Sequence, residues 1–156
     1  MNPFDVIYGW FVSLFGNNLD SFLLGGECDG LEVVETGSDL YTGIGLVALA
    51  IAVVIMVVYY YVINSSKLNK WWHWVIVLLF IGVINLFIGY GWTSGELANI
   101  GDCLMYLDGD NATASLITES DCWMFGLANF FVSGIFFIIA TFVGKWWSTS
   151  LRRTPF

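Results

Sequence analysis

Three long stretches of this chain contain no charged residue and consist mainly of large apolar side chains, at 43–63, 74–92 and 123–144. A helix needs about 20 apolar residues to cross the hydrocarbon core of a bilayer. A helix of that length in a soluble core would carry a charged face, and none of these does. The sequence therefore predicts an all-α polytopic membrane protein with three transmembrane helices, at 43–63, 74–92 and 123–145.

The composition of the whole chain agrees with a membrane environment. Of the 156 residues, 58% are hydrophobic and only 12% are charged, whereas a soluble domain has about 45–50% and about 25%. This length accommodates one domain of a few spans. We therefore expect residues 1–156 to form a single membrane domain that ends in a cytoplasmic tail, 146–156, without a separate soluble domain.

Residues 3–16 predict a short amphipathic helix before the first span. Asn2-Pro3 is a typical helix start, Asp5 lies in the expected first turn, and Gly16 ends the apolar run. The segment is too short to cross a bilayer and lacks the basic flank of a signal peptide. We expect it to be retained and to lie flat at the membrane interface.

Charged residues are sorted by sign along the chain. All thirteen acidic residues precede the first span or lie between the second and third, and all five basic residues occupy the other two hydrophilic regions: Lys67, Lys70, Lys145, Arg152 and Arg153. Loops rich in Lys and Arg stay in the cytoplasm. We expect an outside N-terminus, an extracytoplasmic loop at 93–122 and a cytoplasmic C-terminus, in a bacterial inner (plasma) membrane.

The tripeptide Lys-Trp-Trp occurs twice, at the start of the second span and at the end of the third, on the predicted cytoplasmic surface both times. Trp settles at the level of the lipid headgroups, and Lys reaches past it to water and phosphate. The predicted interface anchors are Lys70, Trp71, Trp72, Trp74, Lys145, Trp146 and Trp147. A cation–π cage built from the paired tryptophans is the alternative. The predicted opposite belt is Tyr41, Tyr90, Trp92 and Trp123.

The three cysteines, Cys28, Cys103 and Cys122, all fall on the predicted outer side, where disulfides persist in an oxidising compartment. Cys103 and Cys122 bracket an Asp108-Gly109 pair between apolar runs, which predicts a hairpin. A disulfide between them would close the hairpin and contribute about 3 kcal/mol. Cys28 would then be free or joined to a neighbouring subunit. The acidic loop matches no calcium-binding pattern, so we predict no metal site.

Polar residues inside the predicted spans are few and uncharged. Asn85 lies roughly 10 Å below Trp92 and Asn129 roughly 9 Å below Trp123, at 1.5 Å per residue, and Ser133 follows on the same stripe as Asn129. The absence of ionisable residues argues against a proton relay. Asn85, Asn129 and Ser133 either pack helices together among small residues or line a water-filled pathway.

No catalytic constellation is present in the sequence. There is one histidine, His73, and no phosphate-binding loop, HExxH or CxxC motif. Neither a nucleophile with a base nor paired acids occur within the spans, and one histidine cannot ligate haem twice. We therefore predict a protein that is not an enzyme, holds no cofactor and binds no nucleic acid.

Two functions remain after these exclusions. Three helices cannot enclose a pathway alone, but a closed ring of identical subunits can. The first prediction is a homo-oligomeric membrane protein that forms a small ion channel or pore, for example the membrane effector of a bacterial stress or defence pathway. The alternative is a non-conducting scaffold or accessory subunit, in contact with the lipid bilayer and with other membrane subunits.

Overall fold

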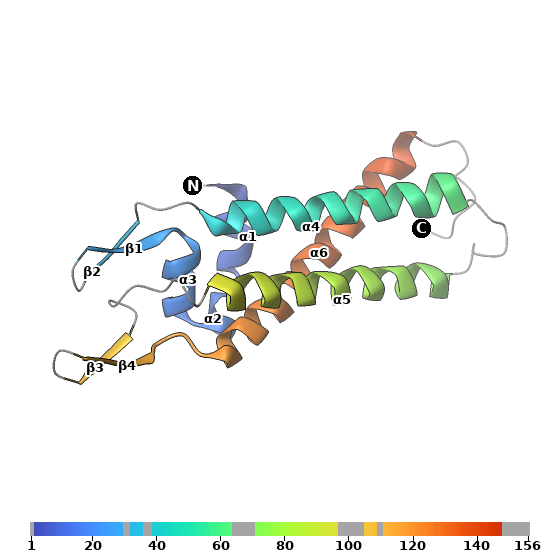
Figure 1. Ribbon diagram of the computed structural model, residues 1–156. Coiled ribbons are helices and arrows are strands. Elements are labelled where there is room, and N and C mark those ends of the chain that lie inside the picture. Colours follow the sequence, from blue (N-terminus) through green and yellow to red (C-terminus); the bar gives the residue numbers. More distant parts are fainter. Residues whose placement is uncertain are drawn as a thin grey trace.

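The computed structural model describes residues 2–29, 32–35, 39–63, 71–96, 105–108 and 111–147 (Figure 1). Side chains are described for the same residues except 27–35, 62–63, 105–115 and 145–147. Within these ranges the chain forms three long helices, three short helices near the N-terminus and two small hairpins. The predicted all-α membrane architecture is therefore correct in outline, and the hairpins are its only strands in the described part.

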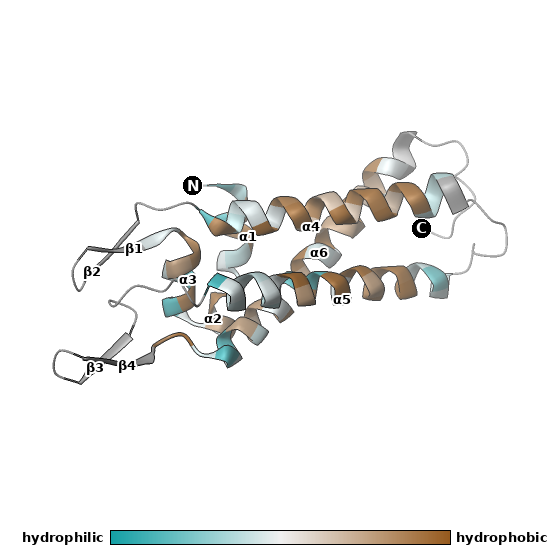
Figure 2. Cartoon of the chain, viewed as in Figure 1, coloured by the Kyte–Doolittle hydropathy of each residue, from teal (hydrophilic) through white to brown (hydrophobic). Residues whose placement is uncertain are grey.

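The three long helices coincide with the predicted spans. They are α4 (Leu40–Val57), which continues as the π-helix η1 (Val58–Ile63), α5 (Trp71–Glu96) and α6 (Glu119–Trp147). All three are long and apolar enough to cross a membrane. Figure 2 shows α4 and α5 as brown along their middle turns and paler or teal toward their ends. The prediction of three helices with the length and apolarity of membrane spans is confirmed.

The helices form an up-down-up bundle in which α6 lies against both other spans. α4 and α5 run in opposite directions, and α6 crosses obliquely behind them (Figure 1). The largest interface joins α5 to α6, and α4 packs on α6 more than on α5. Four fully buried side chains of α6 form the centre of the core: Phe125, Ala128, Val132 and Phe137. The third span is thus the central element of the fold.

Small residues mark where the backbones of α5 and α6 approach. A Cβ atom at Gly126 would lie 2.8 Å from the carbonyl oxygen of Leu86, and one at Gly89 would lie 3.0 Å from Cβ of Asn129. Distances this short leave no room for a methyl group without a shift of the helices. Small residues allow helices in membranes to pack closely, so the small-residue stripes of the two spans meet each other within one chain.

The N-terminal segment is broken into α1 (Pro3–Gly9), α2 (Val12–Phe15) and α3 (Asn17–Leu23). α1 starts where predicted, with the main-chain N–H of Asn2 donating a hydrogen bond to Asp5 Oδ2 at 2.8 Å. Instead of one continuous helix over 3–16, the chain bends between α1 and α2. The bend lets the segment follow the surface of the bundle. A positive φ of 87° at Gly16 then starts α3, which the sequence did not predict.

Two antiparallel hairpins lie beyond the end of the bundle where α4 begins (Figure 1). β1 (Gly26–Asp29) pairs with β2 (Glu32–Glu35), and β3 (Met105–Asp108) pairs with β4 (Asn111–Ser115). In the second hairpin Asp108 pairs with Asn111, at the Asp-Gly signal noted in the sequence. The first hairpin carries the same signal, Asp29-Gly30, and was not predicted. Hairpin residues extend one end of the bundle.

The described acidic side chains of helices and caps lie at one end of the bundle, which we call the acidic end. They gather where α4 begins: Asp5, Asp20, Asp39, Glu96, Glu119 and Asp121. The side chains of the five basic residues lie outside the described part of the chain. The structure therefore places the acidic part of the predicted sorting of charge at one end of the spans.

Candidate functional site

A buried hydrogen-bonded cluster joins the N-terminal segment to two spans, and Asn129 of α6 is its centre. Oδ1 of Asn129 accepts a hydrogen bond from the Tyr8 hydroxyl at 2.6 Å, and its Nδ2 donates to the main-chain oxygen of Asn85 at 2.7 Å. Tyr8, Asn85 and Asn129 are all completely buried. One amide therefore holds α1, α5 and α6 together inside the apolar bundle.

The three polar residues singled out from the sequence all lie in this interior. Asn85 and Asn129 meet at one level of the bundle, and Asn85 Nδ2 donates to the Ile81 oxygen of its own helix at 3.0 Å. Ser133 is also fully buried, and its hydroxyl donates to the Phe130 oxygen at 2.9 Å. Asn85 Oδ1 is the one polar atom of the three side chains without a hydrogen-bond partner among the described residues.

Two tyrosines extend the cluster toward the acidic end of the bundle. The rings of Tyr8 and Tyr41 stack with centroids 5.0 Å apart, and the Tyr41 hydroxyl donates to Asp20 Oδ1 at 2.6 Å. Burial raises the pKa of the Tyr8 hydroxyl above its ordinary value, so it remains a neutral donor. Sequence reasoning missed Tyr8, although a tyrosine among the apolar residues of a short helix is a usable signal because its hydroxyl needs a buried partner.

The prediction that Tyr41 belongs to a lipid-facing aromatic belt is wrong. Its ring is completely buried, between Tyr8 and Phe125. The remaining belt residues behave differently: Tyr90 stacks on Trp123 at 4.1 Å and donates its hydroxyl to Glu119 Oε1 at 2.8 Å. The N-terminal helices cover Tyr41, whereas nothing in the described part of the chain covers the outer side of Trp123.

A polar contact also ties the start of α1 to the start of α4. Asn2 Nδ2 donates to Asp39 Oδ2 at 2.7 Å, and the Thr42 hydroxyl donates to the same oxygen at 2.6 Å. Burial alone would raise the pKa of Asp39, but the hydrogen bonds from Thr42 and Asn2 outweigh it and hold that pKa below its ordinary value. The charged carboxylate is therefore the form that fastens the N-terminal segment.

The predicted anchors at the end where α5 begins are only partly placed by the structure. Trp71 and Trp72 are exposed at the start of α5, with ring centroids 4.1 Å apart. Trp74 is partly buried, and its ring packs on Phe137 with centroids 5.8 Å apart. Lys70 lies outside the described residues, as do the side chains of Lys145, Trp146 and Trp147, so the structure provides no geometry for the alternative cation–π cage.

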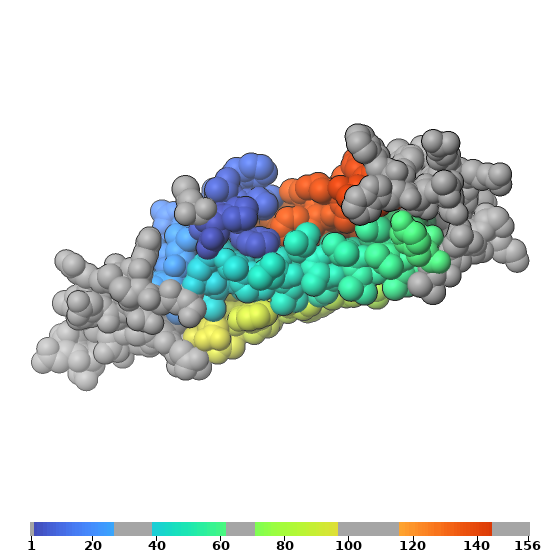
Figure 3. All heavy atoms as spheres, turned by 90° about the horizontal axis from the view of Figure 1, so that it is seen from above, coloured from blue at the N-terminus to red at the C-terminus, as the bar shows by residue number. Residues whose placement is uncertain are grey.

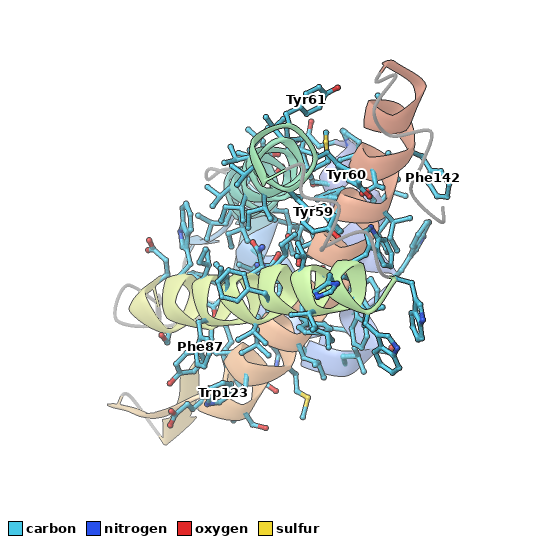
Figure 4. The ribbon with its side chains drawn as sticks, turned by 90° about the vertical axis from the view of Figure 1, so that its right-hand side faces the viewer. Tyr59, Tyr60, Tyr61, Phe87, Trp123 and Phe142 are labelled. Atoms are coloured by element: carbon cyan, nitrogen blue, oxygen red, sulfur yellow. The ribbon has the colours of Figure 1, made fainter. Side chains whose placement is uncertain are left out.

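Aromatic side chains project outward from the bundle (Figure 4). Tyr61 of η1 points outward and is exposed, while Tyr60 beside it is almost buried. Phe87 and Trp123, toward the other end, contact each other edge to face at 6.2 Å and are both exposed. Aromatic residues are typical of the two membrane–water interfaces of a spanning protein.

The described part of the chain contains no disulfide, and Cys103, the predicted partner of Cys122, lies outside it. Cys122 carries a free thiol and is completely buried in the first turn of α6, within the apolar core. Its side chain therefore faces the bundle interior instead of the hairpin that it was expected to close. Cys103 and the side chain of Cys28 lie outside the described part of the chain.

Among the described residues, no three His, Cys, Asp or Glu side chains come together as a metal-binding group. No known protein family, curated protein sequence or solved structure matches this chain.

Proposed function

We propose that this chain is a non-conducting structural subunit of a membrane complex, a scaffold or accessory protein without catalytic activity or cofactor. The observation that carries the proposal is the fate of the polar residues within the spans. Asn85, Asn129 and Ser133 are fully buried inside a single chain and hydrogen-bonded there. A ring of such subunits would present none of these side chains to a shared pathway.

The outward surface of the spans supports the same proposal. α5 exposes large apolar side chains at spacings of four, three and four residues, at Ile76, Phe80, Val83 and Phe87. This is the spacing of a seam along which one helix packs on another. Lipid or the apolar helices of other membrane subunits fit this face, whereas water does not.

The proposed orientation places the acidic end outside a bacterial inner membrane and both basic segments in the cytoplasm, in accordance with the positive-inside rule. The two hairpins are then extracytoplasmic, and α1–α2 is the amphipathic element at the outer interface. The described acidic side chains at the end where α4 begins, and the segregation of basic residues into other segments of the sequence, support this arrangement.

A homo-oligomeric ion channel is the second candidate, and one observation favours it. Asn85 Oδ1 is a buried acceptor without a partner among the described residues, and a water molecule would satisfy it. A channel of this kind would bring water to the centre of the bundle, or would use the apolar outer faces as a hydrophobic constriction.

Cysteine accessibility combined with conductance distinguishes the two candidates. Asn85→Cys and, as an exposed control, Thr118→Cys are made with Cys28 and Cys103 replaced by serine. A membrane-impermeant thiol reagent should modify the Thr118 variant and leave the Asn85 variant unmodified, and planar bilayers containing the unmutated chain should be silent. Rapid modification at position 85 together with unitary currents from a ring-shaped particle would overturn the scaffold proposal in favour of the channel.

A further inference from the structure

The N-terminal helices lie across the spans at a level that only one leaflet of a bilayer occupies. α1 and α2 run perpendicular to α4 (Figure 1), and Phe11 stacks on Phe131 of α6 with centroids 6.1 Å apart and planes within 4°. Phe131 lies eight residues beyond Trp123, which is at most about 12 Å along the helix. Phe4 of α1 also reaches Phe136, further along the oblique α6, but it lies against Gly45, which is five residues and at most about 8 Å from the start of α4. Half of a hydrocarbon core is about 15 Å thick, so α1–α2 packs mainly within the half nearer the acidic end.

The surface that α1–α2 turns away from the bundle is apolar. Val6, Trp10 and Leu14 are spaced by four residues and are 42%, 69% and 43% exposed. On the spans, Leu46 lies beside Gly45, which contacts Phe4, and Phe131 contacts Phe11; Leu46 and Phe131 are both about half exposed. Side chains of the spans at this level face lipid. The lipid acyl chains that cover Leu46 and Phe131 therefore also cover the apolar ridge formed by Val6, Trp10 and Leu14.

α3 differs from the two helices before it and marks the boundary with water. Its first residues, Asn17 and Asn18, are exposed and polar, and its Asp20 accepts the hydrogen bond from Tyr41. The ridge formed by Val6, Trp10 and Leu14 carries no charge, while Asp5 beside it is turned toward Asn2. Apolar α1–α2 is thus followed directly by a helix with a polar exposed start.

The N-terminal segment is fixed in place by three polar contacts instead of floating beside the bundle. Asn2 is bonded to Asp39, Tyr8 to Asn129 and Asp20 to Tyr41. Phe4 in addition fills the space that Gly45 leaves open on α4. Figure 3 shows the result as a bulge of dark blue atoms beside α4 and α6, near the end where α4 begins.

We propose that α1–α2 is embedded in one leaflet and gives the protein a wedge shape. The wedge favours curved membranes in which the acidic end lies on the convex side. The segment from Pro3 to Phe15 adds two short helices to that leaflet, α1 about 10 Å long and α2 about 6 Å long, each about 10 Å wide. The other leaflet holds the three spans alone within the described part of the chain. Helices embedded at this depth are sensitive to curvature. The inference holds whether or not the chain conducts, because it depends only on the N-terminal helices.

Sorting between a flat membrane and a narrow membrane tube tests the wedge. The full chain carries Thr118→Cys, with Cys28 and Cys103 replaced by serine, and is reconstituted into giant vesicles of zwitterionic phosphatidylcholine. An impermeant dye added outside labels only copies whose acidic end faces out. These copies should be enriched at least about twofold in tubes pulled from the vesicle, relative to a lipid dye.

Two variants of the ridge provide the comparison. A Val6→Ser, Trp10→Ser, Leu14→Ser variant should distribute evenly between tube and vesicle, because its polar face leaves the acyl chains. A Val6→Leu, Trp10→Phe, Leu14→Val variant keeps an apolar face and should sort like the parent. Even distribution of the parent, or equal enrichment of the serine variant, would overturn the proposal.

A depth measurement keeps the proposal testable if the serine variant does not fold. With the native cysteines at positions 28 and 103 replaced, a bimane on Trp10→Cys should be quenched by lipids brominated in the acyl chain and shielded from aqueous iodide. Quenching by iodide without quenching by brominated lipid would place Trp10 in water and reject the embedded wedge.

Discussion

Two glycines of α6 provide a matched test of how closely α5 and α6 approach. A Cβ atom at Gly126 would lie 2.8 Å from the main-chain oxygen of Leu86 and 3.4 Å from Cβ of Tyr90. A Cβ atom at Gly134, two turns further along the same helix, would meet nothing within 4 Å. Gly126→Ala must therefore move one backbone relative to the other, while Gly134→Ala places its methyl group in open space.

The expected difference follows from two terms. Overpacking a well-packed contact costs about 1–3 kcal/mol. Alanine favours a helix over glycine by about 1 kcal/mol, and this gain is common to both positions and cancels between them. Gly126→Ala should therefore have a free energy of unfolding about 1–3 kcal/mol lower than Gly134→Ala. Gly134→Ala should be at least as stable as the unmutated chain.

The free energies can be measured by reversible unfolding in mixed micelles, with SDS as the denaturant and helix content followed by circular dichroism. Each variant should first be checked for native helix content without SDS. If the two alanine variants agree within about 0.5 kcal/mol, the range of a neutral substitution, then α5 and α6 do not meet at Gly126. The packing of the polar cluster would then be wrong as well.

Two further predictions concern the attachment of the N-terminal segment. A double-mutant cycle of Tyr8→Phe and Asn129→Ala should give a coupling of about 0.6–1.7 kcal/mol, as for other hydrogen bonds between membrane helices, whereas strictly additive effects would contradict the Tyr8–Asn129 contact. The lowered pKa of Asp39 means that its stabilising contribution is complete above its ordinary pKa of about 4 and is lost as pH falls below it. Acidification should therefore release α1 to proteolysis more steeply in the unmutated chain than in Asp39→Asn; identical profiles would show that this carboxylate does not fasten the segment.

The sequence was sufficient to predict the spans because a bilayer selects for little more than length and apolarity. α5, α6 and α4 together with η1 each contain the apolar stretch from which they were predicted, and they extend past it where polar residues continue the helix. The contact between Asn85 and Asn129 could also be predicted, because both residues lie at a similar distance from the same end of their spans. Rise per residue along a helix is reliable over ten residues.

The orientation of individual side chains was not predictable in the same way. A segment that is apolar on every face carries no periodic signal for which face is buried, so Tyr41 was taken for a belt residue. Its ring turns inward because of neighbours distant in the sequence, Tyr8 and Phe125. The burial of Cys122 was not predictable either, because it depends on where the first turn of α6 points the thiol.

The hydrogen bond from Tyr8 to Asn129 joins residues 121 positions apart, which imposes an order on biosynthesis. Tyr8 leaves the ribosome first, and its acceptor enters the lipid only when the last span is inserted. Until that moment the hydroxyl of Tyr8 has no acceptor on α6, and the surface on which α1–α2 packs is incomplete. Seating of the N-terminal helices thus completes assembly, and a chain arrested before α6 displays an unburied tyrosine and a loose hydrophobic segment to the proteases that clear unfinished membrane proteins.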